Sequence, residues 1–180
     1  IDSILEQTFA DFELIIIDDG STDSTPTILR GYSDDRVRVS INETNLGLPA
    51  SLNRGIKCAR GQYIARMDAD DLSCPGRLER QVQYLDENSQ VHVVGCYVDK
   101  IGRNGEYLST RRYRLGARDV DSLKSDGSGI AHPSVMMRTS SVTNVGNYRR
   151  EFEFAQDLDL WVRMAEEYGP DFLDIISEVL

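Results

Sequence analysis

The feature that most restricts the fold of this chain is the alternation of strand-like and helix-like segments along nearly its whole length. Such alternation is typical of an α/β domain in which helices cover both faces of a mostly parallel sheet. Strands are predicted at residues 13–17, 36–41, 63–67, 91–99, 106–113 and 134–137. Helices are predicted within residues 1–7, 24–32, 48–60, 75–85 and 155–168, where apolar residues recur at helical spacing. The 180 residues therefore predict one α/β domain.

Acidic residues outnumber basic ones, with 30 Asp and Glu against 20 Lys and Arg and a formal net charge of -10. Because nucleic-acid binding needs a positive surface, this balance argues against a nucleic-acid partner. Cys58, Cys74 and Cys96 lack the spacing of a disulfide framework or a zinc site and are predicted to be small buried groups. The longest strongly apolar run, residues 14–17, is far too short to cross a bilayer.

Two clusters of carboxylates each follow directly after an apolar strand. Asp18 and Asp19 follow the first predicted strand, and Asp68, Asp70 and Asp71 follow the third. Ligands of open α/β sheets bind at the carboxyl ends of strands, so both clusters are predicted to face one cleft. At about 4 Å and an effective dielectric constant of about 20, two carboxylates repel by roughly 4 kcal/mol, which favours a bound cation. Such oxygens suit Mg²⁺ or Mn²⁺ bridging to a phosphorylated ligand. The alternative is two solvated turns with helix-capping residues.

A third carboxylate stands at the start of the predicted helix 155–168. Asp157 and Trp161 share one face of this helix, whereas Asp159 points roughly 200° away around it. A carboxylate beside a tryptophan at the edge of a core is partly desolvated, which raises its basicity and suits a general base. The alternative is that both aspartates only stabilise the first turn of the helix.

Six short motifs occur in order along the chain. They are Asp18-Asp19-Gly20-Ser21-Thr22-Asp23, Asn45-Leu46-Gly47, Ala59-Arg60-Gly61, Asp68-Ala69-Asp70-Asp71, His132-Pro133-Ser134-Val135 and Gln156-Asp157-Leu158-Asp159-Leu160-Trp161. In this order and spacing they resemble glycosyltransferase family 2. The resemblance implies the GT-A fold and transfer of a sugar from a nucleotide-sugar donor to a saccharide or lipid-linked acceptor, with inversion at the anomeric carbon.

The resemblance also implies roles for individual carboxylates. Asp18 and Asp19 would lie at the nucleotide, with Asp19 at the base. Asp68 and Asp70 would form the D-x-D motif, in which Asp68 reaches the ribose or the metal and Asp70 ligates Mg²⁺ or Mn²⁺ on the diphosphate. Asp157 would be the general base that accepts the proton of the incoming hydroxyl.

Further expectations follow from the same resemblance. His132, Asp71 and Trp161 are expected to contact the donor or the acceptor, although an isolated histidine more often has a structural role. Residues 1–99 are expected to form the nucleotide-binding part of the single GT-A domain and residues 100–180 the acceptor-binding part. The first strand of the family is expected to be missing from this chain, which would then be truncated at its N-terminus.

The expected partners are a nucleotide-sugar, with a UDP-sugar as the first choice, and a saccharide or lipid-linked acceptor. The resemblance points to construction of cell-envelope polysaccharide at the cytoplasmic face of the plasma membrane, with peripheral membrane association through other parts of the protein.

Two other classes of protein compete with this interpretation. A non-catalytic module that binds nucleotide-sugar or glycan would have no use for the base Asp157. A phosphoacceptor receiver-like domain would share the acidic pair Asp18-Asp19, but it needs a phosphorylatable Asp after the next strand, where this chain has Asn42.

Overall fold

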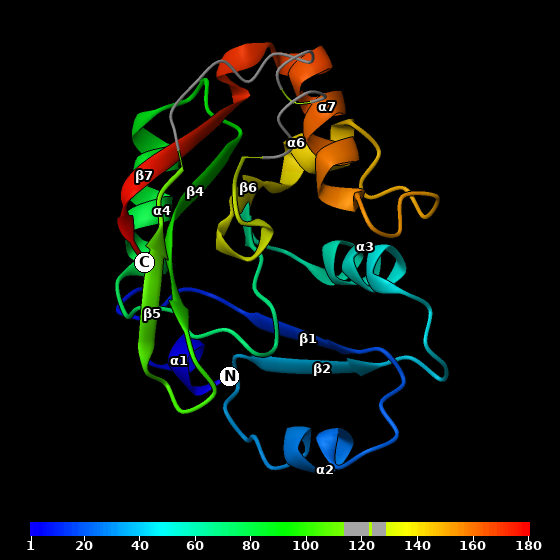
Figure 1. Ribbon diagram of the computed structural model, residues 1–180. Helices are drawn as coiled ribbons and strands as arrows, with labels where there is room; N and C mark the ends of the chain where they lie inside the picture. Colours follow the sequence, from blue (N-terminus) through cyan, green and yellow to red (C-terminus); the bar gives the residue numbers. More distant parts are fainter. Residues whose placement is uncertain (114–122, 124–128) are drawn as a thin grey trace.

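The described strands pair into two sheets with no backbone ladder between them. The computed structural model describes residues 1–113, 123 and 129–180 (Figure 1). One sheet pairs β1 (Leu14–Asp18) with β2 (Val37–Ile41). The other has the order β3-β6-β4-β5, and β7 also pairs with β4. Its strands are β3 (Tyr63–Ala65), β4 (Val93–Ile101), β5 (Tyr107–Arg111), β6 (Met136–Arg138) and β7 (Leu173–Val179).

The described strands are more mixed in direction than the predicted mostly parallel sheet. The β1–β2 and β4–β7 ladders are parallel, whereas β3–β6, β4–β6 and β4–β5 are antiparallel. The β4–β5 connection is too short for the crossover that parallel strands need, so this pair forms a hairpin. Gly105, at φ +82°, supplies the left-handed backbone of its turn.

Helices cover both faces of the larger sheet, as predicted. The helices of the described chain are α1 (Asp2–Leu5), α2 (Thr25–Leu29), α3 (Leu48–Cys58), α4 (Arg77–Glu87), α6 (Thr139–Asn144) and α7 (Gln156–Tyr168), with the 3-10 turns η1 (His132–Ser134) and η2 (Pro170–Phe172). Of these, α4 and α7 lie on opposite faces of the larger sheet. Successive strand residues point to opposite faces. Val94 of β4 therefore packs in the cluster that contains Leu78 and Leu85 of α4, and Val93 packs in the cluster that contains Trp161 of α7.

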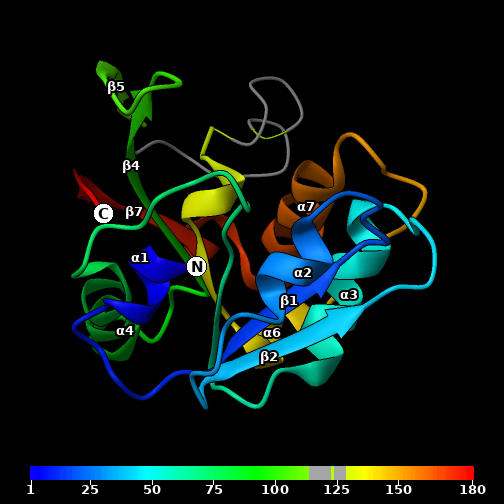
Figure 2. The ribbon, with the colours of Figure 1, turned by 90° about the horizontal axis from the view of Figure 1, so that it is seen from below.

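Helix α3 connects the two sheets. Its Leu52 and Ile56 pack against the cluster that contains the buried residues of α7. The view from below shows α3 beside α7 and next to β1 and β2 (Figure 2). The loop that leads into α7 is thereby held close to the helix that follows β2.

The fold also departs from the sequence predictions in detail. Strand β7 and helix α6 were not predicted. Of the three cysteines expected in the core, only Cys96 is buried; Cys58 is half-buried and Cys74 is exposed. Within the described residues, no helix combines the length and the apolar composition that a membrane crossing requires.

Candidate active site

Asp18 ends strand β1 with a carboxylate that is only half satisfied. The residue is 4% exposed, and its Oδ1 accepts the backbone N–H of Ser21 at 2.9 Å. Its Oδ2 is buried and has no hydrogen-bond partner among the described residues. Because buried polar atoms are nearly always partnered, this oxygen marks a place where a ligand or water completes the site.

Asp19 organises the loop between β2 and α3. Its Oδ1 accepts from Asn42 Nδ2 at 2.6 Å and from the backbone N–H of Leu46 at 2.9 Å, and its Oδ2 accepts from the N–H of Gly47 at 3.0 Å. Burial by itself raises the pKa of Asp19, but these hydrogen bonds outweigh it and hold the pKa below its ordinary value. The predicted contact of Asp19 with a nucleotide base stays a prediction.

The acidic turn (residues 68–71) follows β3 and carries three carboxylates, of which Asp68 pairs with Arg66. Arg66 donates to both oxygens of Asp68, from Nη1 to Oδ2 at 2.9 Å and from Nη2 to Oδ1. Asp70 is exposed, and its carboxylate has no partner among the described residues. Partial burial, with the charges of Asp68 and Asp70, raises the pKa of Asp71. The turn therefore concentrates negative charge.

The acidic turn has the ligand chemistry that Mg²⁺ or Mn²⁺ requires. Among the described residues, no three His, Cys, Asp or Glu side chains converge as a ready-made metal cage. Mg²⁺ usually binds one or two carboxylates together with substrate phosphates and waters, so such a cage is unnecessary. Among the described residues, the unpartnered Asp70 fits this role. After burial, the charges of Asp68 and Asp70 are what raises the pKa of Asp71, and a cation would offset that part.

A buried polar group lies between the acidic turn and α7. His132 Nε2 and Tyr148 Oη are 2.7 Å apart, and the His132 ring meets Trp161 edge-on at 6.1 Å. Burial, aided by the charge of Arg66, lowers the pKa of His132 to about 3, so the ring is neutral. Burial also raises the pKa of Tyr148, where the charge of Arg66 acts to lower it and that of Asp157 to raise it.

The two aspartates of α7 have different surroundings. Asp157 is half-buried and has no hydrogen bond or ion pair with any other described residue. Asp159 is engaged in ion pairs, with Arg163 at 2.7 Å and with Arg149 at 3.5 Å. Arg163 in turn donates to the carbonyls of Val145 and Asn147. Asp159 therefore fixes the loop before α7, whereas the carboxylate of Asp157 is not engaged by any other described residue.

The predicted site residues fall into two groups, the acidic turn with Asp157 and the pair Asp18 and Asp19, and the contacts between the two groups are indirect. The charges of Arg66 and Asp157 both act on Tyr148, so Arg66, which pairs with Asp68, and Asp157 each lie near this buried side chain. Within the described residues, no hydrogen bond or ion pair joins Asp18 or Asp19 to that turn. The connection runs through α3, since Asn53 Nδ2 donates to the carbonyl of Tyr148 at 2.7 Å.

Sequence reasoning missed Arg66 as part of this site. For Arg66 a signal existed, because Arg66 and Asp68 alternate in an extended segment and so share one side. Trp161 is fully buried and His132 is 8% exposed, which does not favour their predicted ligand contacts. Those contacts stay predictions.

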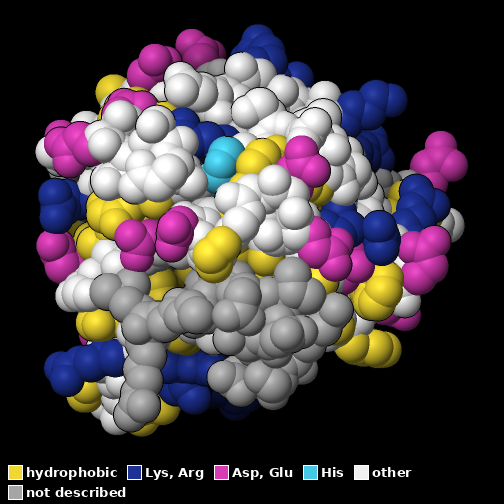
Figure 3. All heavy atoms as spheres, turned by 90° about the horizontal axis from the view of Figure 1, so that it is seen from above, with side chains coloured by type: hydrophobic (Ala, Val, Ile, Leu, Met, Phe, Trp, Pro, Cys, Tyr) yellow, Lys and Arg dark blue, Asp and Glu magenta, His cyan; other side chains and the backbone are white. Residues whose placement is uncertain are grey.

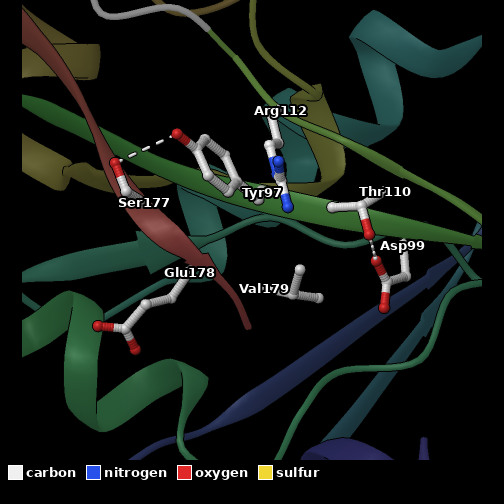
Figure 4. A pocket seen from close by; sticks show the side chains of 7 residues that line it. All are labelled: Tyr97, Asp99, Thr110, Arg112, Ser177, Glu178 and Val179. Carbon is white, nitrogen blue, oxygen red and sulfur yellow. Dashed lines mark hydrogen bonds between the residues drawn. The ribbon is translucent and has the colours of Figure 1, made fainter.

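Two features of the described surface lie outside this site. The face seen in Figure 3 mixes acidic, basic and apolar side chains without a broad basic area. A cavity of about 500 Å³ opens between β4, β7 and the segment around β5, and it contains none of the predicted site residues (Figure 4). It is lined by Tyr97, Asp99, Thr110, Arg112, Ser177, Glu178 and Val179.

The fold and these motifs define the class of the protein. Residues 1–146 match the sequence model of Glycosyl transferase family 2, and the chain belongs to this family. Among solved structures, the crystal structure of S. aureus TarS 1-349 matches with a TM-score of 0.75 and 26% identity, covering 98% of this chain and 52% of that chain. The match confirms the predicted GT-A fold.

Particular relatives agree with this assignment. An uncharacterized glycosyltransferase of Haemophilus influenzae is 44% identical over 172 residues, which cover 89% of this chain and 53% of that protein. The O-antigen biosynthesis glycosyltransferase WbnJ of Escherichia coli is 34% identical over 182 residues, which cover 100% of this chain and 70% of that protein. The chain spans 61% and 62% of the length of two further curated relatives.

Proposed function

We propose that this protein is an inverting glycosyltransferase that transfers a sugar from a nucleotide-sugar donor to a hydroxyl group of an acceptor. The observation that carries the proposal is the membership of the chain in glycosyltransferase family 2. It is supported by the charges of Arg66, which pairs with Asp68, and of Asp157, since both act on the buried Tyr148. Phosphate recognition and proton removal then act on the same bound donor and acceptor.

Asp157 is the proposed general base. Its carboxylate has no partner among the described residues, so it is free to accept a proton. When Asp157 takes the proton of the acceptor hydroxyl, the oxygen attacks the anomeric carbon and the bond to the diphosphate breaks. This single displacement inverts the anomeric centre. General-base help of this kind is worth typically about 10²–10⁴-fold in rate.

Asp70 and Asp68 are the proposed holders of Mg²⁺ or Mn²⁺. When bound, the metal would supply Lewis-acid stabilisation of the charge on the leaving diphosphate. Asp18, whose buried Oδ2 has no described partner, is the proposed contact to the nucleoside together with Asp19. His132, which hydrogen-bonds to Tyr148 and meets Trp161 edge-on, is proposed to steady α7.

The proposal extends to the classes of donor and acceptor. The donor is a nucleotide-sugar, with a UDP-sugar as the first choice, and the acceptor is a saccharide or a lipid-linked saccharide. WbnJ is named for O-antigen biosynthesis. We propose that this protein acts in a similar process, the assembly of cell-envelope polysaccharide at the cytoplasmic face of a membrane, and that it associates peripherally with that membrane.

The test is a screen of the protein against a panel of nucleotide-sugars with Mn²⁺ and saccharide acceptors, reading released nucleotide. Asp157→Asn should reduce turnover by about 10²-fold or more while donor binding persists. Asp171→Asn, which changes an exposed aspartate of η2, is the matched control and should leave turnover unchanged. Full turnover by the Asp157→Asn variant, or a product that retains the donor's anomeric configuration, would contradict the proposal.

A further inference from the structure

We propose that Arg66 is a positioning residue of the donor site, which fixes the Asp68 carboxylate in the orientation that receives the ribose or the metal. The inference deepens the proposed function and rests on it. It concerns a residue that lies just before the D-x-D motif and outside it.

The backbone of Arg66 is held on both sides. Its N–H donates to the carbonyl of Val135 at 2.9 Å, and its own carbonyl accepts from Arg77 Nη2 at 2.7 Å. Arg77 is itself buried, and its Nε donates to Gln81 at 3.0 Å. The origin of the Arg66 side chain is therefore fixed by the sheet and by α4.

The guanidinium group of Arg66 binds Asp68 from the buried side. The side chain of Arg66 is 7% exposed and that of Asp68 is 42% exposed, so a buried arginine supports a carboxylate that reaches solvent. The two parallel hydrogen bonds use one lone pair on each carboxylate oxygen. Each oxygen keeps a second lone pair, with which Asp68 can accept a hydroxyl or bind a cation.

Within the described residues, Asp68 is the carboxylate that pairs with Arg66, and Asp71 feels its charge without a hydrogen bond to it. The groups that sense its charge from other elements are the neutral His132, the hydroxyl of Tyr148 and the cation of Arg77. Arg66 Nε is buried and has no hydrogen-bond partner among the described residues. A buried cation with an unpartnered N–H weakens the fold, so packing alone does not explain Arg66. Orientation of Asp68 does explain it.

The chemistry requires arginine at this position. Only a planar guanidinium group presents two N–H donors in parallel to one carboxylate, whereas a lysine offers a point charge. Groups that orient a metal ligand from behind typically change metal affinity by about 10–100-fold when they are removed. A loss of this size is expected here.

The experiment is calorimetric titration of the protein with UDP, GDP and dTDP in the presence of Mn²⁺. Arg66→Gln should weaken binding of the preferred nucleotide by about 10–100-fold, and Arg66→Lys should lie between this variant and the wild type. Arg60→Gln is the matched control, because the Arg60 side chain is 74% exposed, and it should bind like the wild type. Circular-dichroism melting confirms that each variant is folded, and Arg66→Lys carries the test if Arg66→Gln does not fold.

A double-mutant cycle shows whether Arg66 acts through Asp68. If it does, adding Arg66→Gln to Asp68→Asn causes little further loss of binding. Fully additive losses, or wild-type affinity in the folded Arg66 variants, would overturn the inference while the proposed function stands. If the wild type binds none of the three nucleotides with Mn²⁺, the proposed function itself fails, and the inference with it.

Discussion

The neutral His132 predicts a specific loss of stability in mild acid. Burial, with the charge of Arg66, holds the pKa of His132 at about 3 in the folded protein, against 6.5 for an ordinary histidine. Between these two values the unfolded chain binds one proton more than the folded chain, so the free energy of unfolding falls as the pH falls. From pH 7.5 to pH 5.5 this linkage amounts to roughly 1 kcal/mol.

The assay is urea unfolding at both pH values for the wild type and for His132→Gln. Glutamine can still hydrogen-bond to Tyr148 but does not titrate, so this variant should lose about 1 kcal/mol less than the wild type between pH 7.5 and pH 5.5. His92→Gln serves as a comparison, because burial also lowers the pKa of the half-buried His92 and this variant should likewise lose less stability than the wild type. An equal loss in the wild type and in His132→Gln would refute the reasoning.

Two further substitutions test the framework of the site. Asp159→Asn leaves the buried Arg163 without its ion-pair partner, and should lower the free energy of unfolding by about 3–5 kcal/mol in urea titration; a loss below about 1 kcal/mol would contradict this. Gly20→Ala places a Cβ 2.7 Å from the backbone carbon of Thr44 at a φ of +76°, and should cost about 1–3 kcal/mol, measured by thermal unfolding. An unchanged melting temperature would show that the loop around Thr44 shifts freely.

The periodicity of the sequence predicted most elements of the fold, because their apolar residues face a core directly. Helix α6 escaped prediction since its sequence, Thr139–Asn144, consists mainly of Ser, Thr and Asn, which are poor helix formers. Strand β7 is extended because it forms a long-range parallel ladder with β4, and no local sequence pattern reveals that pairing. The exposed Cys74 shows that residue type alone does not settle burial.

The acidic motifs could be found in the sequence, but the partners of each carboxylate could not. Asp19 looks the same as Asp18 in the sequence, yet only the folded loop gives it the backbone N–H groups of Leu46 and Gly47. Likewise, Asp157 and Asp159 both lie in the first turn of α7. Arg163 forms an ion pair with Asp159, whereas Asp157 has no ion pair or hydrogen bond with another described residue. These differences depend on residues that come together only in the tertiary structure.

The most direct test of the account is a crystal structure of the protein with a bound nucleoside diphosphate and Mn²⁺. We expect the diphosphate at the acidic turn, with Asp70 on the metal and the carboxylate of Asp157 facing the same cleft. A nucleotide bound elsewhere, for example in the cavity beside Tyr97 and Arg112, or an Asp157 carboxylate turned away from the bound diphosphate, would contradict it.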